Sequence, residues 1–493
     1  MASKSAIKQH ILFHLCLNTL VVFFITGASY YHLPLSGFKD TLTYFNHLLI
    51  LQSSVAGILY FLSFNLWVFR LFFSPLFFLF SAFAFWAYTQ DISVTPHLIQ
   101  AAFESKPDIA IDIISGPFMA YLSLSTVMIY LMNRWRKAIG KSPQPLLFGL
   151  LAAALFSLYP LTENFRPGTL QNRLPYNVVS SISEYQKRPS LTLNQIIPDL
   201  EHHQDSLVMI LVLGESVRAD HLGVNGYERN TTPELSQISG IISFKKLYTE
   251  HTYTAASLPQ ILTDQGQVLK DTTYTSVYSI LNRADFQTHW LGNQTLERGY
   301  APVVATNDSV VLIDAFKNVF SFNKRKDEDL LPPLKAILPN VSRSVISLHM
   351  IGSHWWYEDR YKDKNRRFTP VIDSKYIPSL SPEQLINSYD NTILYLDEFL
   401  SLLINELKQH NTPSVLVYIS DHGEQLGENG KWLHAQAGEA AKNPAYLIWF
   451  SQDYKYRYPE IEKYFQESAL EKATTDRVFY DLLKLTGINH IAD

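Results

Sequence analysis

The chain has 493 residues, of which 47% are hydrophobic and 17% are charged, and its formal net charge is −4. The charged fraction is well below the roughly 25% of an average soluble domain, and only five of the 45 acidic residues lie before residue 160. This composition excludes a disordered chain, a collagen-like chain and a small disulfide scaffold. The absence of a dense basic run argues against nucleic acid as a partner. The single cysteine, Cys16, cannot form an intrachain disulfide and does not identify a redox compartment.

Apolar segments fill the first third of the sequence. A helix needs about 17 to 25 residues to cross a bilayer, and five segments meet or approach this length. We expect these helices at approximately 11–30, 44–69, 71–88, 117–132 and 145–161. The alternative is a set of buried helices in a soluble protein, but residues 71–85 have no polar face at all. Residues 1–161 are therefore predicted to form a transmembrane domain of five helices.

Basic residues in the short loops predict the orientation of these helices. Lys4 and Lys8 precede the first segment, and four further basic residues lie between positions 134 and 141, in the loop before the fifth segment. Because cytoplasmic loops carry an excess of Lys and Arg, the N-terminus is expected in the cytoplasm. An odd number of crossings then places everything after Leu161 on the outer side of the membrane.

A connector and a soluble domain follow. Residues 162–205 contain several prolines, and Val178–Tyr185 has an apolar face at helical spacing that would lie on the membrane surface. Residues 206–493 are predicted to form an α/β domain with helices on both faces of a sheet. Apolar runs predict its buried strands, and they lie at Ser206–Leu213, Val345–Met350, Ser414–Ile419 and Tyr446–Phe450. The clearest helix is Pro382–Leu407, with Ser381 as its N-cap.

Polar residues directly follow three of these strands. Glu215 comes after the first, His354 follows the second, and Asp421 and His422 follow the third, with His434 a little further along. Functional groups gather beyond the carboxyl ends of strands in open α/β sheets. Glu, Asp and His together form a nitrogen and oxygen ligand set that suits zinc, and manganese less well. The sequence therefore predicts a metal site at this edge of the sheet.

A segment rich in hydroxyl groups, Glu250–Pro259, is expected at a junction between a loop and a helix. A hydroxyl at a helix N-terminus has backbone N–H donors and a positive dipole end nearby, which suits a phosphate. A neighbouring metal ion lowers the pKa of such a hydroxyl and makes it a nucleophile. From composition alone, Thr252, Thr254 and Ser257 are equal candidates.

The motifs in this order resemble those of bacterial phosphoethanolamine transferases. These are inner-membrane enzymes of the sulfatase/alkaline phosphatase superfamily, with five membrane helices, and include lipid A modifying enzymes linked to polymyxin resistance. The resemblance implies an α/β/α sandwich as the soluble, periplasmic domain. It rests on Gly214–Asp220, Asn225–Tyr227, Thr254–Pro259, Leu348–His354, Tyr389–Asn391, Ser420–Glu424 and Leu433–His434. Unlike many members of that family, this chain has no cysteines available for disulfides in the outer domain.

The resemblance also implies roles for individual residues. Glu215, Asp421 and His422 would ligate one tightly bound zinc ion, and Thr254 would be the nucleophile that also contacts it. His354 and His434 match histidines that hold the phosphoethanolamine group or a second zinc ion during turnover, and that assist proton transfer.

Three further residues match positions of the family that bind substrate. Arg298 takes the place of a basic residue, often lysine, that contacts the phosphate. Glu104 and Ser105 match part of a pattern that contacts the lipid head group, although the asparagine of that pattern is replaced by Ala101.

The resemblance implies a monomeric, multi-pass enzyme of the bacterial inner membrane with its catalytic domain in the periplasm. It would transfer phosphoethanolamine from phosphatidylethanolamine to lipid A or lipopolysaccharide core through a covalent threonine intermediate. One alternative is a phosphoglycerol transferase of the same superfamily that acts on a glycan or polymer. Another is a catalytically silent membrane sensor, although the expected ligands and nucleophile are all present.

Overall fold

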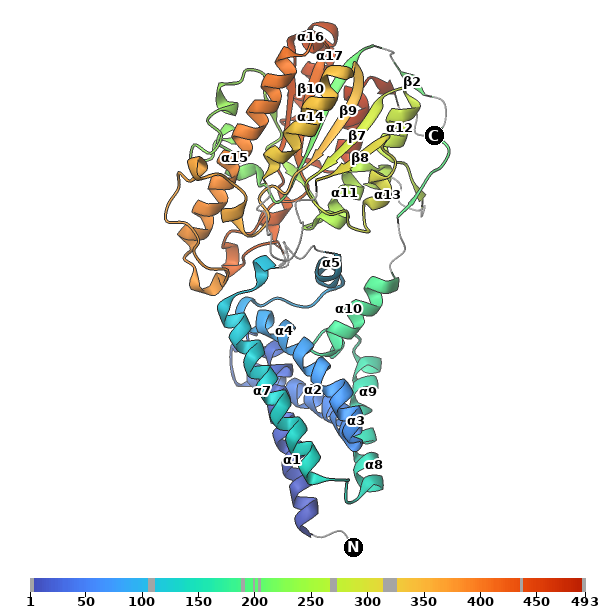
Figure 1. Ribbon diagram of the computed structural model, residues 1–493, viewed down its shortest axis with the longest axis vertical. Coiled ribbons are helices and arrows are strands. Elements are labelled where there is room, and N and C mark those ends of the chain that lie inside the picture. The colour runs from blue at the N-terminus through green and yellow to red at the C-terminus, as the bar shows by residue number, and fades with distance from the viewer. Residues whose placement is uncertain are drawn as a thin grey trace. The chain divides into compact units, whose positions relative to one another are not determined.

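The computed structural model in Figure 1 describes residues 4–104, 111–187, 191–197, 200–202, 205–266, 273–313, 326–434 and 438–489. The chain divides into two compact units. The first comprises Met1–Phe103, Ile114–Arg188 and Tyr376–Pro378, and the second comprises Glu104–Ile113, Pro189–Lys375 and Ser379–Asp493. Each unit is described separately below.

The first unit is helical. Its helices are α1 (Lys4–Phe24), α2 (Phe38–Phe64), α3 (Leu66–Val68), α4 (Ser74–Gln90), α5 (Pro96–Glu104), α7 (Gly116–Ile139), α8 (Pro145–Phe156), α9 (Leu158–Phe165) and α10 (Tyr176–Lys187). A single wider turn at Phe69–Phe73 joins α3 to α4, so one helical rod runs from Leu66 to Gln90. Helices thus cover all five segments predicted from hydropathy, with ends that differ by several residues.

Aromatic and aliphatic side chains at helical spacing form the interior of this unit. On α1, Phe13, Leu17 and Val21 recur every four residues and are buried, so they lie on one face of the helix. Phe69 and Phe73 stack with their ring centroids 4.5 Å apart. The connector helix α10 contributes Val178, which is fully buried in the same cluster.

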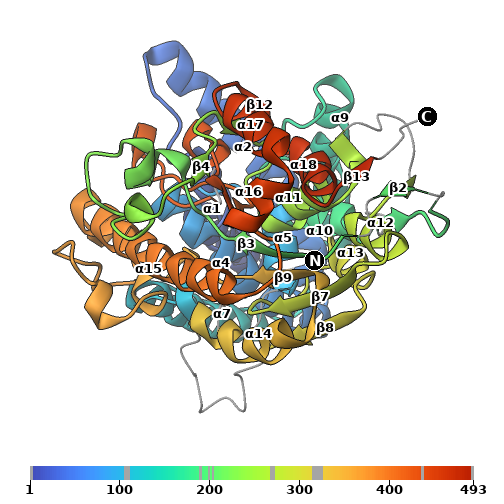
Figure 2. The same cartoon turned by 90° about the horizontal axis from the view of Figure 1, so that it is seen from above.

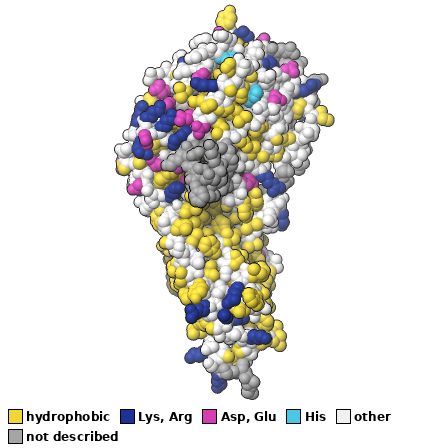
Figure 3. All heavy atoms as spheres, viewed as in Figure 1, with side chains coloured by type: hydrophobic (Ala, Val, Ile, Leu, Met, Phe, Trp, Pro, Cys, Tyr) yellow, Lys and Arg dark blue, Asp and Glu magenta, His cyan; other side chains and the backbone are white. Residues whose placement is uncertain are grey.

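The outer surface of the first unit is also apolar. On the face shown in Figure 3, hydrophobic side chains form a broad band above a region where Lys and Arg gather. Leu146, for example, is 78% exposed, which would be unfavourable in water. Within the described residues, four helical stretches are long and apolar enough to span a membrane: Lys4–Phe24, Phe38–Phe64, Leu66–Gln90 and Pro145–Phe165. Helix α7 has 24 residues but falls outside this set, so a fifth crossing remains a prediction.

The second unit is built on a mixed sheet. Among the described residues, seven strands form this sheet in the order β4-β11-β10-β3-β9-β7-β8. They are β3 (Leu207–Gly214), β4 (Ile242–Ser243), β7 (Gln287–Gly292), β8 (Ser309–Leu312), β9 (Arg343–His349), β10 (Ser414–Ser420) and β11 (Tyr446–Phe450). The strands from β10 to β8 are mutually parallel, whereas β11 and β4 are antiparallel to their neighbours. Shorter strands pair outside it: β1 (Thr192–Leu193) with β6 (Thr273–Tyr274), β5 (Leu247–Tyr248) with β12 (Ala473–Thr474), and β2 (Glu201–His202) with β13 (Ile488–Asn489).

Helices cover both faces of the main sheet, as Figure 2 shows from above, with α14 and α15 on one side and α11, α12 and α18 on the other. The helices of this unit are α11 (Thr254–Leu262), α12 (Val277–Arg283), α13 (Ala301–Val304), α14 (Leu331–Ile337), α15 (Pro382–Gln409), α16 (Gln452–Arg457), α17 (Pro459–Ser468) and α18 (Arg477–Leu485). This confirms the predicted fold class, an α-helical membrane domain followed by an α/β/α sandwich. The boundaries at 161 and 205 remain predictions.

Local sequence explains why the elements form where they do. Every residue of β3 is buried, as expected for a strand covered on both faces, and its alternate side chains enter the core with α11, α12 and α18. Helix α15 begins at the predicted N-cap, Ser381. The structure adds a capping box, in which the Ser381 hydroxyl accepts from the Gln384 N–H and the Gln384 side chain accepts from the Ser381 N–H.

Candidate metal and nucleophile site

Two carboxylates are brought together by the ends of neighbouring parallel strands. Gly214 of β3 pairs with Ser420 of β10, so the residues that follow them, Glu215 and Asp421, leave the sheet side by side. The Asp421 N–H donates to the Gly214 carbonyl at 3.2 Å, which continues the pairing by one step. Both carboxylates are about 1% exposed. This is the edge of the sheet where the sequence predicted a functional site.

Thr254 lies against both carboxylates. It is the first residue of α11, and its hydroxyl oxygen is 2.7 Å from Asp421 Oδ2 and 2.9 Å from Glu215 Oε2. Composition left three hydroxyls as equal candidates. The structure separates Thr254 from Ser257, whose hydroxyl donates to the Tyr253 carbonyl within the helix. Of these two hydroxyls, that of Thr254 contacts the predicted ligands.

His422 turns one ring nitrogen toward the same carboxylates. Its Nδ1 donates to the Gly423 carbonyl at 2.7 Å, so Nε2 carries the lone pair. That Nε2 is 3.4 Å from Glu215 Oε1 and 3.4 Å from Asp421 Oδ2, and it has no hydrogen-bond partner in the described part of the chain. A buried imidazole with one N–H held by a carbonyl and the other nitrogen unsatisfied is typical of a metal ligand.

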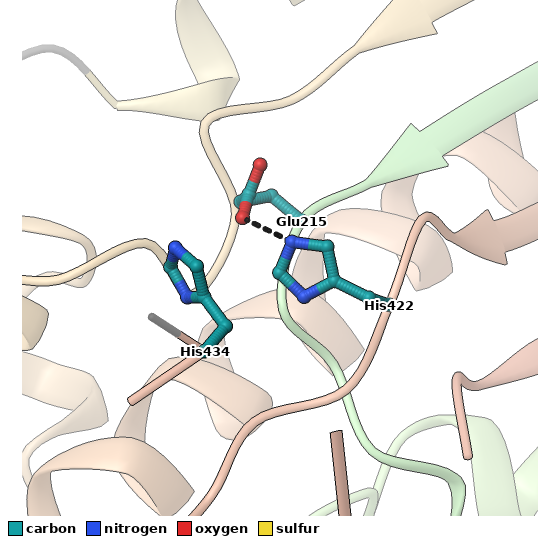
Figure 4. Close-up of side chains that lie close together, drawn as sticks. All are labelled: Glu215, His422 and His434. Atoms are coloured by element: carbon teal, nitrogen blue, oxygen red, sulfur yellow. Dashed lines mark ion pairs between the residues drawn. The ribbon is translucent and has the colours of Figure 1, made fainter. Parts of the chain in front are cut away.

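The spacing of these atoms fits one ion. Ligand atoms about 2.0–2.1 Å from a tetrahedral zinc ion lie about 3.3 Å apart, close to the distances between His422 Nε2 and the two carboxylates. The residues present therefore fit a divalent cation. A wider grouping, Glu215, His422 and His434, also places its ligand atoms within 4.8 Å of one another (Figure 4). We favour the set with Asp421 for one ion, because Asp421 contacts both Thr254 and His422.

The electrostatics of the carboxylate pair also favour a cation. Burial raises the pKa of Asp421 well above its ordinary value, and the charge of Glu215 adds to this effect. Burial would also raise the pKa of Glu215, but the nearby histidines, His422 first, lower it below its ordinary value. Adjacent buried carboxylates cannot easily ionise together. A divalent cation between them would allow both to be charged.

His434 is adjacent to this group. Its Nδ1 is 3.3 Å from Glu424 Oε2 and 3.4 Å from the Ser216 hydroxyl, and its ring centroid is 4.8 Å from that of His422. Burial would lower the pKa of His434, but the Glu424 carboxylate raises it to about 9. Figure 4 shows the imidazoles of His422 and His434 on the same side of the Glu215 carboxylate.

His354 lies next to His434. The ring centroids of the two histidines are 5.9 Å apart, and His354 Nδ1 donates to the Trp355 carbonyl at 2.6 Å. Burial lowers the pKa of His354 to about 4, and the Arg360 guanidinium contributes to this shift. The structure thus brings together all six residues predicted for catalysis and metal binding.

Gly352 and Gln294 support Glu215. Gly352 was predicted only as part of the Leu348–His354 motif, and Gln294 was not predicted. Gly352 has φ +51°, and a Cβ atom there would lie 2.8–2.9 Å from atoms of Glu215. The Gln294 amide nitrogen donates to Glu215 Oε2 at 3.2 Å and to the Met350 carbonyl at 2.7 Å. Gln294 follows β7, whose sequence Gln287–Gly292 lacks the continuous apolar run of the central strands. Recognition of β7 would have indicated this residue.

Of the three predicted substrate-binding residues, the structure describes Arg298 and Glu104. Arg298 is exposed, and its backbone N–H donates to Glu104 Oε2 at 2.7 Å. These two predicted residues are therefore in contact. Ser105 lies outside the described residues. Between Gln294 and Arg298, the structure adds Glu297, which was not predicted. Burial, followed by the charge of Glu104, raises the pKa of Glu297 to about 8.

The fold and the site together define a class of protein. This is a chain with membrane-spanning helices and an α/β/α domain, in which strand ends bring two buried carboxylates and a histidine next to a threonine hydroxyl. Residues 207–488, more than half of the chain, match the sulfatase family. The chain therefore belongs to the sulfatase family.

Individual relatives agree with this assignment. Phosphoethanolamine transferase EptA of Escherichia coli K12 is 29% identical over 496 residues, which cover 92% of this chain and 89% of the relative. Phosphatidylethanolamine transferase Mcr-1 of Escherichia coli is 32% identical over 246 residues, or 46% of this chain and 44% of the relative. The expected resemblance to phosphoethanolamine transferases is thus confirmed.

Solved structures extend the likeness to the whole fold. Integral membrane lipooligosaccharide phosphoethanolamine transferase A from Neisseria meningitidis has a TM-score of 0.78, with 97% of this chain and 96% of that chain covered at 21% identity. The soluble domain of the same protein gives a TM-score of 0.52 at 29% identity and covers 61% of this chain and 94% of that chain.

Proposed function

We propose that this protein is a metal-dependent transferase that moves phosphoethanolamine from phosphatidylethanolamine to lipid A or lipopolysaccharide core through a covalent intermediate on Thr254. The observation that carries the proposal is the contact of the Thr254 hydroxyl with both Glu215 and Asp421. The names of the relatives support the transferred group, and the Neisseria enzyme supports a lipooligosaccharide acceptor. The relatives named above give no support to the phosphoglycerol alternative.

In the first step, the Thr254 oxygen attacks the phosphorus of phosphatidylethanolamine. A P–O bond to Thr254 forms and the P–O bond to diacylglycerol breaks. The oxygen of the leaving diacylglycerol takes up the one proton that Thr254 gives up, and His354 or His434 assists this transfer. The hydroxyl proton of Thr254 passes to a carboxylate that it already contacts, Asp421 or Glu215. The charge of the phosphoryl oxygens must be neutralised for this transfer.

In the second step, a hydroxyl or phosphate oxygen of the acceptor attacks the same phosphorus. The bond to Thr254 breaks and its oxygen regains a proton. His354 and His434 would hold the phosphoethanolamine group and assist proton transfer, since both lie beside the ligand set. Arg298 and Glu104 would bind the lipid-derived substrate, together with Ser105.

Glu215, Asp421 and His422 would hold the cation, and zinc suits this set better than manganese. When bound, such an ion lowers the pKa of a neighbouring hydroxyl and neutralises phosphoryl charge. The proposal includes a second zinc ion that His354 and His434 would bind during turnover. It also includes a monomeric state of the enzyme.

We also propose that the chain resides in the bacterial inner membrane with the second unit in the periplasm. The Lys and Arg residues near one end of the helical unit (Figure 3) support a cytoplasmic N-terminus. This orientation would place Thr254 on the membrane side where a lipopolysaccharide acceptor is found before its export.

The test uses the purified full-length protein in detergent with phosphatidylethanolamine and lipid A. Wild type should release diacylglycerol and form a phosphoethanolamine adduct on the peptide that contains Thr254. Thr254→Ala should abolish both, whereas Ser257→Ala, a hydroxyl of the same helix, should retain them. Normal turnover by Thr254→Ala would overturn the proposal, and a product with the mass of a phosphoglycerol adduct would favour the alternative.

A further inference from the structure

A buried carboxylate outside the ligand set is connected to His354. Asp112 belongs to a short stretch of the second unit, Ile111–Ile113, and is 4% exposed. Its Oδ2 accepts from Arg360 Nη2 at 2.9 Å and its Oδ1 accepts from Lys375 Nζ at 2.8 Å. The Asp112 carbonyl also accepts from the Trp355 indole N–H at 3.2 Å.

Arg360 carries this connection to the candidate site. Its Nε donates to the His354 carbonyl at 3.0 Å and its Nη2 donates to the Trp355 carbonyl at 3.2 Å. The Trp355 carbonyl is also the acceptor for His354 Nδ1 at 2.6 Å. Arg360 and the His354 imidazole therefore share one acceptor, and the tautomer and direction of the His354 ring depend on where that carbonyl is held.

Stability alone explains this ion pair poorly. The Arg360 and Asp112 side chains are only 5% and 6% exposed. The free energy needed to remove two charges from water is often as large as the free energy gained from their attraction. A buried ion pair is therefore weak evidence of stabilisation. Its geometry, by contrast, fixes two consecutive carbonyl groups and one indole around His354. A hydrogen-bonded partner that orients a functional histidine commonly affects activity by 10- to 100-fold.

We propose that Asp112 is a positioning residue that acts through Arg360 on His354, so that the imidazole Nε2 faces the substrate group. The proposal rests on the proposed function, in which His354 holds or protonates that group. It assigns a role in the reaction to a residue 242 positions before His354 in the chain. Asp112 would act through Arg360 and is not one of the proposed metal or substrate ligands.

Asp112→Asn is the informative variant, because it keeps the shape of the side chain and removes its charge. The rate of phosphoethanolamine transfer should fall about tenfold. In a His354→Ala background, Asp112→Asn should change the remaining rate less than twofold, because its effect passes through the missing imidazole. A purely structural effect would lower the rate by the same factor in both backgrounds.

Asp481→Asn is a matched control. Asp481 is also buried and accepts two bonds from an arginine, Arg477, at 2.8 and 3.1 Å. This variant should lower the thermal unfolding midpoint but leave the transfer rate within twofold of wild type. If Asp112→Asn does not yield folded protein, Arg360→Lys gives the same test, because it keeps the charge and loses the forked contacts to the two carbonyls.

The outcomes separate the two proposals. An inactive wild type would refute the proposed function and this inference with it. An active wild type in which Asp112→Asn has no effect, or in which its effect multiplies with that of His354→Ala, would refute only the positioning role. A tenfold loss that disappears in the His354→Ala background would support it.

Discussion

Replacing Gly352 by alanine perturbs the proposed metal site through one carbon atom. Gly352 has φ +51°, and its new Cβ would lie 2.8 Å from the Glu215 carbonyl oxygen and 2.9 Å from the Glu215 nitrogen and Cβ. Real Cβ atoms do not approach other atoms this closely, so Glu215 or the Gly352 backbone must shift. The left-handed backbone adds about 1–2 kcal/mol, and such an overpacked contact costs about 1–3 kcal/mol. The expected destabilisation is about 2–5 kcal/mol.

Gly226→Ala is the matched control for this substitution. Gly226 also has a positive φ, +95°, but a Cβ atom there would have nothing within 4 Å. It should therefore suffer the backbone strain without any contact to the site. Comparison of the two variants separates strain from displacement of Glu215.

The assays are thermal unfolding in detergent and zinc affinity by competition with a chromophoric chelator. Gly352→Ala should weaken zinc binding about 10- to 100-fold, which is the usual effect of disturbing a ligand's support. Gly226→Ala should lower the unfolding midpoint but bind zinc like wild type. The reasoning is refuted if Gly352→Ala folds, binds zinc with wild-type affinity and transfers phosphoethanolamine at the wild-type rate.

Two further predictions concern side chains close to the site. The Ser216 hydroxyl donates to Glu215 Oε1 at 2.7 Å. Ser216→Ala should therefore lower the zinc affinity about tenfold, whereas Ser216→Thr keeps the hydroxyl and should not. Equal zinc affinities of the two variants would contradict this prediction. The pKa of Glu297 is raised from 4.5 to about 8, first by burial and then by Glu104. Between pH 4.5 and about 8, Glu297 is ionised in the unfolded chain but protonated in the folded chain, so the free energy of unfolding decreases as pH rises. Glu297→Gln should remove this decrease in the metal-free protein, measured as unfolding midpoints from pH 5 to 8, and an unchanged pH slope would show that Glu297 ionises normally.

Much of the sheet was predictable from the sequence because its central strands are buried on both faces. Such strands read as continuous apolar runs, and β3, β9, β10 and β11 were all found in this way. Such runs are typical of parallel strands, and the expectation of a parallel strand was wrong for β11, which is antiparallel to β10. The edge strand β8 was missed. It has only four residues, and its apolar side chains Val310–Leu312 are about 40% exposed, so the run differs from those of the buried central strands in length and in setting.

The candidate site was predictable to the extent that its residues directly follow these strands. Glu215 and Asp421 were predicted to lie together because each follows a predicted buried strand, whereas the choice of Thr254 required the family resemblance. Contacts between distant parts of the chain left no local pattern. The bond between Arg360 and Asp112, which are 248 residues apart, could not have been inferred from sequence spacing.

The central claim is that one divalent cation is held by Glu215, Asp421 and His422, and its most direct test is the metal content of the purified protein. The account predicts about one zinc ion per chain in wild type and in the control His410→Gln, whose Nε2 contacts the Leu338 carbonyl. Asp421→Asn and His422→Ala should contain little or none. Wild type that transfers phosphoethanolamine without bound metal, or ligand variants that retain a full zinc ion, would contradict the account.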